Sequence, residues 1–208
     1  MRTLTRRVAA LAIVSTLTLA GCGGAGDDLT DDDAPATDTT SSATEAPDDE
    51  DDAADDTEVP DGDTIEGTGY TFAVPEGWRS GKAPSAAIDV AVGDAEDDDG
   101  FADNINVIRL DPAPLQDPDP LEDALVKELE GVGSQNITVR DRLEVDGAPA
   151  VHIASALTQQ GTTYQAEQYN PIKDGVSYVI TFSFSDTVSE DDRDDLAESV
   201  LASWKWAS

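Results

Sequence analysis

The first third of the chain lacks the side chains from which a folded core is built. From Cys22 to residue 68 it has 18 acidic residues, no lysine or arginine, and no aromatic residue. Such a segment buries too little apolar surface to offset the conformational entropy lost on folding. The composition therefore predicts a disordered acidic tether over residues 22–68. A functional alternative for the same segment is the collection of divalent cations or the docking of a basic partner.

The residues ahead of this tether have the layout of a signal peptide. Three arginines within the first seven residues precede an uncharged, mostly apolar run of 13 residues from Val8 to Ala20. A helix needs about 20 apolar residues to cross a bilayer, so a permanent membrane span is the weaker interpretation. The sequence therefore predicts a signal peptide over residues 1–21.

The end of the signal peptide, Leu19-Ala20-Gly21-Cys22, resembles the lipobox of bacterial lipoproteins. The resemblance implies that the chain is cut before Cys22 and that the thiol of Cys22 carries a diacylglyceryl group. Two acyl chains suffice for stable anchoring, which implies a lipoprotein on the outer face of the cell membrane. Cys22 is the only cysteine, so its modification leaves neither a disulfide nor a thiol nucleophile. The alternative is that Cys22 is an incidental unpaired thiol.

Residues 69–208 are expected to form one domain. These 140 residues suffice for a core that buries about two-thirds of the surface of the unfolded chain. They include 27 acidic and 9 basic residues, a net charge of −18, which repels nucleic acid and anionic membrane surfaces and favours cationic partners. A general adaptation to salt would produce the same acidity without implying any partner.

Most of this domain has the pattern of an antiparallel sheet. Alternating apolar residues or short apolar runs predict seven strands, at residues 70–74, 87–92, 105–110, 137–145, 150–157, 163–172 and 176–184. The last four are separated by turn signals at Asp146-Gly147, Gly161 and Asp174-Gly175, which predicts a meander.

Two helices interrupt or follow these strands. Asp119 is expected to cap the first helix, with Pro120 at its first position and Gly131 at its end. Its buried stripe is expected at Leu121, Leu125 and Leu129, which recur every four residues. The second helix is expected to begin after Ser189 as N-cap, with an apolar face of Leu196, Val200 and Trp204. The elements together predict an α+β sandwich.

Several stretches of the domain resemble one family. They are Tyr70-Thr71-Phe72-Ala73-Val74-Pro75-Glu76-Gly77-Trp78, Asn104-Ile105-Asn106-Val107, the final hairpin, and Ser203-Trp204-Lys205-Trp206. These stretches are similar to the LpqN/LpqT lipoproteins of high-GC Gram-positive bacteria, which have the Mog1/PsbP-like fold. The resemblance implies a curved antiparallel sheet flanked by helices and an accessory role in the envelope, linked in some members to lipid export. It implies no catalytic residues.

The residues for catalysis or metal binding are scarce. His152 is the only histidine, and its small and apolar neighbours favour a packed, hydrogen-bonded side chain over a catalytic one. One histidine, with Cys22 lipidated, does not make a zinc site, so no metal is expected. No Gly-x-Ser-x-Gly elbow, phosphate-binding loop or dinucleotide fingerprint is present, so no cofactor is expected. A hydrolase that uses a serine with His152 stays open, and a hydroxyl within reach of His152 would favour it.

The acidic loop from Asp94 to Asp99 invites comparison with a calcium loop. Asp97, Asp99 and Gly100 fall at the third, fifth and sixth positions of an EF-hand, but the first and twelfth positions carry no acidic residue. A solvated loop is therefore the favoured interpretation, with weak calcium binding as the alternative.

Six large aromatic residues have two alternative roles. They are expected mostly in the core, but a cleft between sheet and helix that holds an apolar ligand would need several of them at its wall. These residues are Trp78, Trp204, Trp206, Tyr164, Tyr169 and Tyr178.

The favoured function is that of a non-enzymatic binding or accessory lipoprotein of the cell envelope, anchored through Cys22. Its partners are expected to be the membrane, and an envelope transport protein or an apolar ligand. The alternatives are a structural or envelope-stress component and a hydrolase that uses His152.

Overall fold

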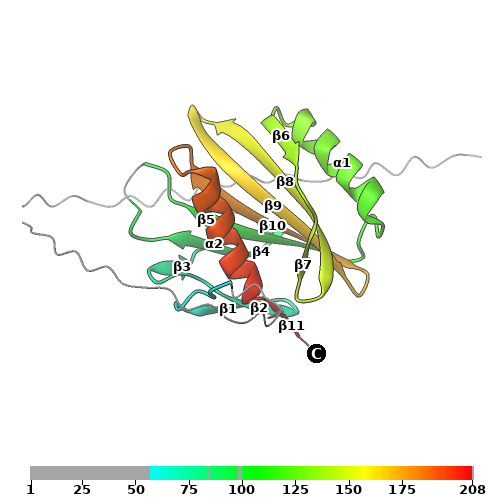
Figure 1. Cartoon of the computed structure of the whole chain (residues 1–208), viewed down its shortest axis with the longest axis horizontal. Coiled ribbons are helices and arrows are strands. Elements are labelled where there is room, and N and C mark those ends of the chain that lie inside the picture. Colours follow the sequence, from blue (N-terminus) through cyan, green and yellow to red (C-terminus); the bar gives the residue numbers. More distant parts are fainter. Residues whose placement is uncertain (1–56, 84, 98–99, 208) are drawn as a thin grey trace, which may run out of the picture. The chain divides into compact units, whose positions relative to one another are not determined.

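The structure, a computed structural model, describes residues 57–83, 85–97 and 100–207, which form an α+β fold (Figure 1). The predicted signal peptide, Cys22 and most of the predicted tether lie outside the described residues. The described strands are β1 (Thr64–Gly67), β2 (Tyr70–Ala73), β3 (Trp78–Ser80), β4 (Ile88–Asp94), β5 (Asn104–Leu110), β6 (Gln135–Val139), β7 (Leu143–Val145), β8 (Ala148–Gln159), β9 (Thr162–Lys173), β10 (Val176–Ser185) and β11 (Lys205–Trp206). The described helices are α1 (Pro118–Gly131) and α2 (Glu190–Ala202). Neither of them combines the length and apolar composition needed to span a membrane.

The strands form two antiparallel sheets. The large sheet has eight strands in the order β3-β4-β5-β10-β9-β8-β6, and β7 pairs with the start of β8 beside this path. The small sheet has the order β1-β2-β11, so it joins the two ends of the described chain. The long strands β8, β9 and β10 form the centre of the large sheet (Figure 1).

Three two-residue turns connect β7, β8, β9 and β10. They are Asp146-Gly147, Gln160-Gly161 and Asp174-Gly175, and both residues of each turn have positive φ, from 45° to 91°. Two successive positive φ angles define the type I′ turn, whose twist matches that of a β-hairpin. The predicted meander and its turns are confirmed.

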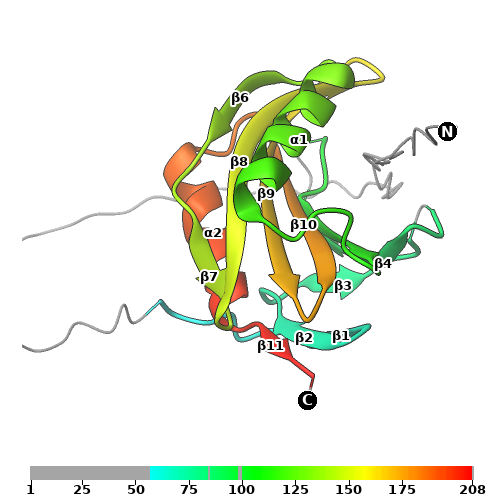
Figure 2. The same cartoon turned by 90° about the vertical axis from the view of Figure 1, so that its right-hand side faces the viewer.

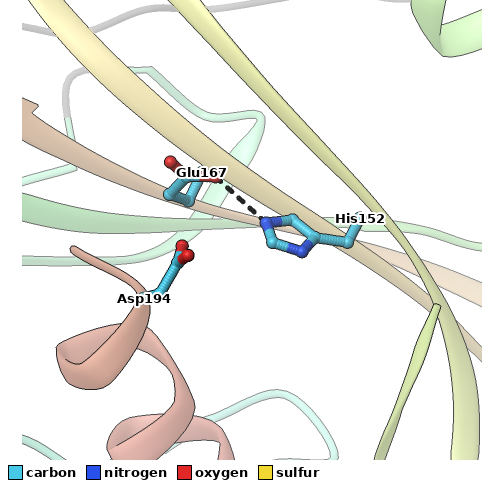
Figure 3. Close-up of side chains that lie close together, drawn as sticks. All are labelled: His152, Glu167 and Asp194. Atoms are coloured by element: carbon cyan, nitrogen blue, oxygen red, sulfur yellow. Dashed lines mark hydrogen bonds and ion pairs between the residues drawn. The ribbon is translucent and has the colours of Figure 1, made fainter. Parts of the chain in front are cut away.

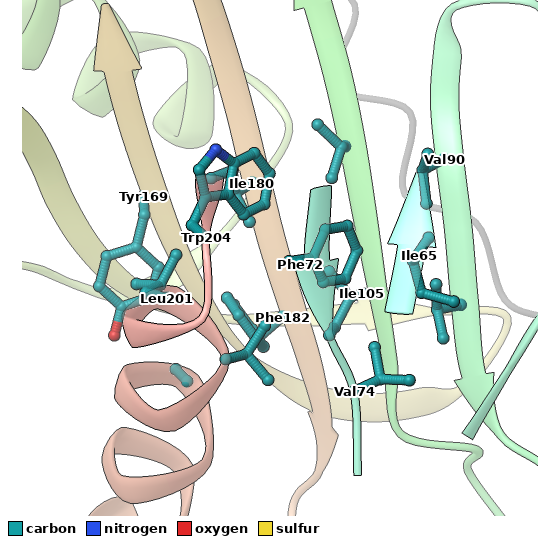
Figure 4. Close-up of a cluster of buried hydrophobic side chains, with 14 of the residues drawn as sticks. Ile65, Phe72, Val74, Val90, Ile105, Tyr169, Ile180, Phe182, Leu201 and Trp204 are labelled. Atoms are coloured by element: carbon teal, nitrogen blue, oxygen red, sulfur yellow. The ribbon is translucent and has the colours of Figure 1, made fainter. Parts of the chain in front are cut away.

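The central strands bury both of their faces, and the two helices lie on opposite faces (Figure 2). On the α1 face, Val151 and Ile153 of β8 pack with the leucine stripe of the helix, as the spacing of these leucines predicted. The α2 face holds the main core, in which Tyr169, Ile180 and Phe182 contact the helix and the small sheet (Figure 4).

An aromatic stack holds the small sheet to this core. The Trp204 ring stacks on the rings of Tyr70 and Phe72, with ring centroids 4.4 and 5.0 Å away. Trp206 extends the cluster, and its indole Nε1 donates a hydrogen bond to the carbonyl of Val145 at 2.9 Å. The C-terminal residues therefore connect the small sheet to β7 of the large one.

The predicted boundary of the tether at residue 68 is wrong, because β1 lies inside the segment predicted to be disordered. Ile65 of β1 pairs with Phe72 and is buried. The backbone N–H and the hydroxyl of Thr68 both donate to the carboxylate of Asp89, at 2.8 and 2.6 Å. This strand is stabilised by pairing with β2 and by contacts with β4, which the composition of its own segment does not reveal.

Three further details differ from the prediction. Helix α1 begins two residues early, after Asp117 as N-cap, because Asp117-Pro118 offers the same Asp-Pro start as residues 119–120. The strand predicted over residues 137–145 is broken into β6 and β7, and the number of strands is higher than seven. Helix α2 begins after Ser189 as predicted, and Leu196, Val200 and Trp204 of its predicted apolar face pack in or against the core, but Trp204 lies beyond the end of the helix and Arg193, Ala197 and Leu201 are also buried.

The position of β1 leads to a stability prediction. A fragment of residues 57–208 should melt several degrees above one of residues 69–208, because full burial of an isoleucine contributes about 2 kcal/mol and strand pairing adds to it. The measurement is thermal unfolding by circular dichroism at one ionic strength. Ile65→Ala in the longer fragment should give an intermediate midpoint, and equal midpoints for both fragments would mean that β1 contributes nothing.

Candidate functional site

A cavity of about 660 Å³ lies between the large sheet, α1 and the loop that precedes α1. This volume is within the range of pockets that hold small molecules, about 300–1,000 Å³. Its walls are largely aliphatic, and the main contributors are Ile108, Leu110, Leu115, Leu121, Leu125, Leu129, Leu157 and Val179. The stripe of α1 thus has two roles, since the leucines that pack on β8 also line the cavity.

The sheet side of the cavity carries uncharged polar side chains. The strand alternation explains this, because Ile180 and Phe182 of β10 face the core while Thr181 and Ser183 face the cavity. The polar lining residues of β5, β8, β9 and β10 are Asn106, Ser155, Gln168, Asn170, Ser177, Thr181 and Ser183.

Four buried polar atoms of lining residues have no hydrogen-bond partner within the described part of the chain. They are Nε of Arg109, the hydroxyl of Tyr164, Oε1 of Gln168 and Oδ1 of Asn170. Burial raises the pKa of the Tyr164 phenol, which therefore stays neutral. A buried polar atom without a partner costs about 1–3 kcal/mol, so a bound molecule that supplies hydrogen bonds here is stabilised.

The cavity offers little to an anion. Arg109 is the one basic residue of its lining, and its guanidinium donates to the carboxylate of Asp111 at 2.7 Å. Asp111 and Glu128 add negative charge to the same lining. A carboxylate or phosphate group would therefore meet no unneutralised cation among the lining residues.

The opposite face of β8 and β9 carries a buried charge cluster (Figure 3). Glu167 of β9 is fully buried, and its Oε2 lies 3.0 Å from Nε2 of His152 on β8. The guanidinium of Arg193 on α2 donates from Nε to Oε1 of Glu167 at 3.2 Å. The ring of His152 stacks on Tyr169, with centroids 4.1 Å apart.

Asp194 of α2 brings a second carboxylate to this cluster. One ligand atom each of His152, Glu167 and Asp194 lie within 4.8 Å of one another. Burial and the charge of Glu167 raise the pKa of Asp194, while Arg140, 3.9 Å from its Oδ2, opposes the rise. Arg140 itself donates to Glu190 at 2.7 Å, and this bond raises the pKa of Arg140.

His152 is packed and hydrogen-bonded, as the sequence predicted. Within the described residues its hydrogen bond runs to Glu167, and no serine or threonine hydroxyl is bonded to it. The buried partners Glu167 and Arg193 were not identified from the sequence. Glu167 is the only charged residue in the strand predicted over residues 163–172, and this is the one signal in the sequence that could have identified it.

The acidic loop uses its described carboxylates to hold its own backbone. Oδ1 of Asp94 accepts from the N–H of Glu96, and Oδ2 of Asp97 accepts from the N–H of Asp103. Residues 98–99, which the calcium hypothesis also requires, lie outside the described residues.

The six aromatic residues divide unequally between their two expected roles. Tyr164 lines the cavity, whereas the other five pack in or against the main core. Apart from Tyr164 the cavity is therefore lined by aliphatic rather than aromatic side chains, and its leucines come from β5, β8, α1 and the proline-rich loop between β5 and α1.

Comparison with known proteins gives similarity in fold. No protein family and no curated protein matches the sequence. Among solved structures, the chain is similar to LpqN of Mycobacterium tuberculosis, described as involved in cell envelope biogenesis, with a TM-score of 0.51 and 17% identity over 73% of this chain and 90% of LpqN. This likeness confirms the fold that the sequence predicted, a Mog1/PsbP-like α+β fold with a curved antiparallel sheet.

Other solved structures also match this chain, with lower TM-scores. The Ran-binding protein Mog1p of Saccharomyces cerevisiae has a TM-score of 0.48 and 11% identity over 67% of this chain and 91% of Mog1p. A protein of Bacteroides thetaiotaomicron has a TM-score of 0.47 and 10% identity over 67% of this chain. The chain spans 45% of the length of that protein.

The charge cluster leads to a second stability prediction. Glu167→Gln should lower the free energy of unfolding by about 3–5 kcal/mol, because it leaves the Arg193 guanidinium buried without a counter-charge. Urea unfolding measures the change. The same substitution at the exposed Glu198 of α2 should change the free energy by less than about 0.5 kcal/mol. Equal effects at both positions would show that the buried pair contributes nothing specific.

Proposed function

We propose that this protein is a non-enzymatic binding module of the cell envelope, anchored to the outer face of the membrane through Cys22. Its ligand is amphipathic, and the apolar part of the ligand occupies the cavity under α1. The observation that carries this proposal is the 660 Å³ cavity with leucine walls in a small domain whose main core is packed separately on the other face of the sheet.

The lining favours a ligand with an aliphatic chain and an uncharged head. Leucine and isoleucine side chains exclude water and are complementary to a hydrocarbon chain. The unpartnered oxygens of Gln168 and Asn170 accept hydrogen bonds, which hydroxyl or amide groups of a ligand would donate. The pairing of Arg109 with Asp111 leaves no cation for a charged head.

The envelope location is supported by the sequence around Cys22 and by the fold. The lipobox-like residues before Cys22 and the acidic segment after it fit a domain held at a distance from a membrane. LpqN, which has a similar fold, is described as involved in cell envelope biogenesis. We propose that this chain likewise supports an envelope process, in which it passes its ligand to or from a membrane transport component.

Titration calorimetry with three twelve-carbon amphiphiles below their micelle concentrations tests the ligand class. Dodecyl maltoside, with its uncharged hydroxylated head, should bind with one site per chain, and more tightly than dodecanoate or dodecylphosphocholine. Equal binding of all three would show that the head group is not recognised, and binding of none would overturn the proposal.

A matched pair of tryptophan variants locates the bound chain. Thr181→Trp fills the cavity and should weaken the binding of dodecyl maltoside by at least about tenfold. Thr138→Trp places the same side chain on the exposed part of β6, outside the cavity, and should leave binding unchanged. Equal binding by the two variants would place the amphiphile elsewhere, and a structural or envelope-stress role would then be the better hypothesis.

The anchor has a separate test. Cys22→Ala should give an uncleaved precursor without lipid, because Cys22 is the only thiol in the chain. Metabolic labelling of cells with a radioactive fatty acid, followed by immunoprecipitation, measures the attachment. A label that persists on the variant would contradict the predicted site of attachment.

A further inference from the structure

Three metal-ligand side chains from three separate elements meet on the α2 face of the sheet (Figure 3). His152 lies on β8, Glu167 lies 15 residues later on β9, and Asp194 lies on α2. One nitrogen and two carboxylate oxygens of these residues are within 4.8 Å of one another. The hairpin register pairs His152 with Tyr169 and makes Glu167 its diagonal neighbour on the same face, and the packing of α2 adds Asp194.

This donor set selects a class of ion. Calcium and magnesium take oxygen ligands, whereas an imidazole nitrogen with carboxylate oxygens suits Zn²⁺ and the neighbouring divalent transition metals. In a tetrahedral zinc site the ligand atoms are about 2.0–2.2 Å from the metal and roughly 3.3 Å from one another. The ligand atoms, which lie within 4.8 Å of one another, have to move closer together when the ion binds, and the half-buried Asp194 on α2 is the side chain with room to move. We infer that His152, Glu167 and Asp194 form a binding site for a divalent transition-metal ion of which Zn²⁺ is representative.

The surroundings hold two of these ligands in place. Arg193 binds Oε1 of Glu167, which leaves Oε2 directed toward His152. The stacked Tyr169 ring restricts the imidazole. On binding, the metal takes the place of the hydrogen between His152 and Glu167, and Nδ1 of His152 carries the imidazole hydrogen instead. Such outer contacts orient the ligands of natural metal sites.

Asp194 gives the ion access to the site. The side chain of Asp194 is 31% exposed, whereas those of His152 and Glu167 are 9% and 1% exposed. Oδ1 of Asp194 is shielded from solvent and has no hydrogen-bond partner among the described residues. An ion that enters beside Asp194 therefore gains a ligand that no other described group uses, and a water molecule completes its coordination on the same side.

The charges nearby permit a dication. Glu167, Asp194 and Glu190 oppose Arg140 and Arg193, so the group carries one net negative charge. A divalent ion changes this sum to one net positive charge, inside a domain that is strongly acidic overall. The two arginines lower the affinity for the ion, but Arg193 also fixes the orientation of the Glu167 carboxylate.

The test uses the chain from residue 22 with Cys22→Ser, which removes the only thiol and retains the acidic segment. Titration calorimetry with Zn²⁺ should show one site per chain, and Co²⁺ should give visible absorption bands of a site with a nitrogen ligand. Asp194→Asn should weaken Zn²⁺ binding by at least about tenfold and abolish the Co²⁺ bands. Excess Ca²⁺ should not displace either metal.

Two control variants make the test specific. Asp195→Asn makes the same change at the next residue of α2, which is exposed, and should bind Zn²⁺ as the parent does. Thr181→Trp fills the cavity on the opposite face and should also leave Zn²⁺ binding unchanged, so the result is independent of the proposed function. Equal Zn²⁺ affinities for Asp194→Asn and Asp195→Asn, with circular dichroism showing both folded, would overturn the inference.

Discussion

The structure depends on strands β8, β9 and β10 being covered on both faces. Successive residues along each strand therefore face opposite sides of the sheet. On β9, Glu167 faces the charge cluster, whereas its neighbours Ala166 and Gln168 line the cavity. A shift of the register by one residue would exchange these environments and place a carboxylate in the leucine-walled cavity. The three type I′ turns fix the register, because each allows only two residues between its strands.

The cavity follows from how little of the sheet α1 covers. The helix packs on β8 and β6 at one end of the large sheet, where its leucines meet Val151 and Ile153. β5 and β10 continue the same face beyond the helix, and their residues there include Asn106 and Thr181. The residual space is therefore walled by leucines on the side of the helix and by both aliphatic and uncharged polar side chains on the side of the sheet, a combination suited to an amphipathic molecule.

Much of the fold could be predicted because its signals are local. The strand alternation, the turn residues, the leucine stripe of α1 and the Ser189 cap each lie within a few residues of the element they define. β1 could not be predicted, because Ile65 is one apolar residue in an acidic segment, and both its partner Phe72 and the Asp89 that binds the adjacent Thr68 lie outside that segment. Its stability comes from pairing, which composition does not encode.

The candidate sites were less predictable than the fold. His152 was recognised as packed, but its partners lie 15 and 42 residues further along the chain and meet it only through the hairpin and helix α2. The volume of the cavity depends on where α1 rests, which the spacing of Leu121 and Leu125 does not determine. Most of the six large aromatic residues were expected in the core, and five of them pack in or against it, so the aromatic residues did not reveal where the cavity lies.

The short turns of the meander also bear on the order in which the molecule assembles. β8, β9 and β10 pair with their sequence neighbours, so each hairpin closes only a small loop and loses little chain entropy. The next pairing, of β10 with β5, joins Ser177 to Leu110 and encloses α1, β6 and the first hairpins. Such a topology favours a folding nucleus in the hairpins of β8, β9 and β10. β5 and β4, and finally the small sheet, then attach to this nucleus. The residues of both candidate sites on β8 and β9 would then be among the first to reach their native neighbours.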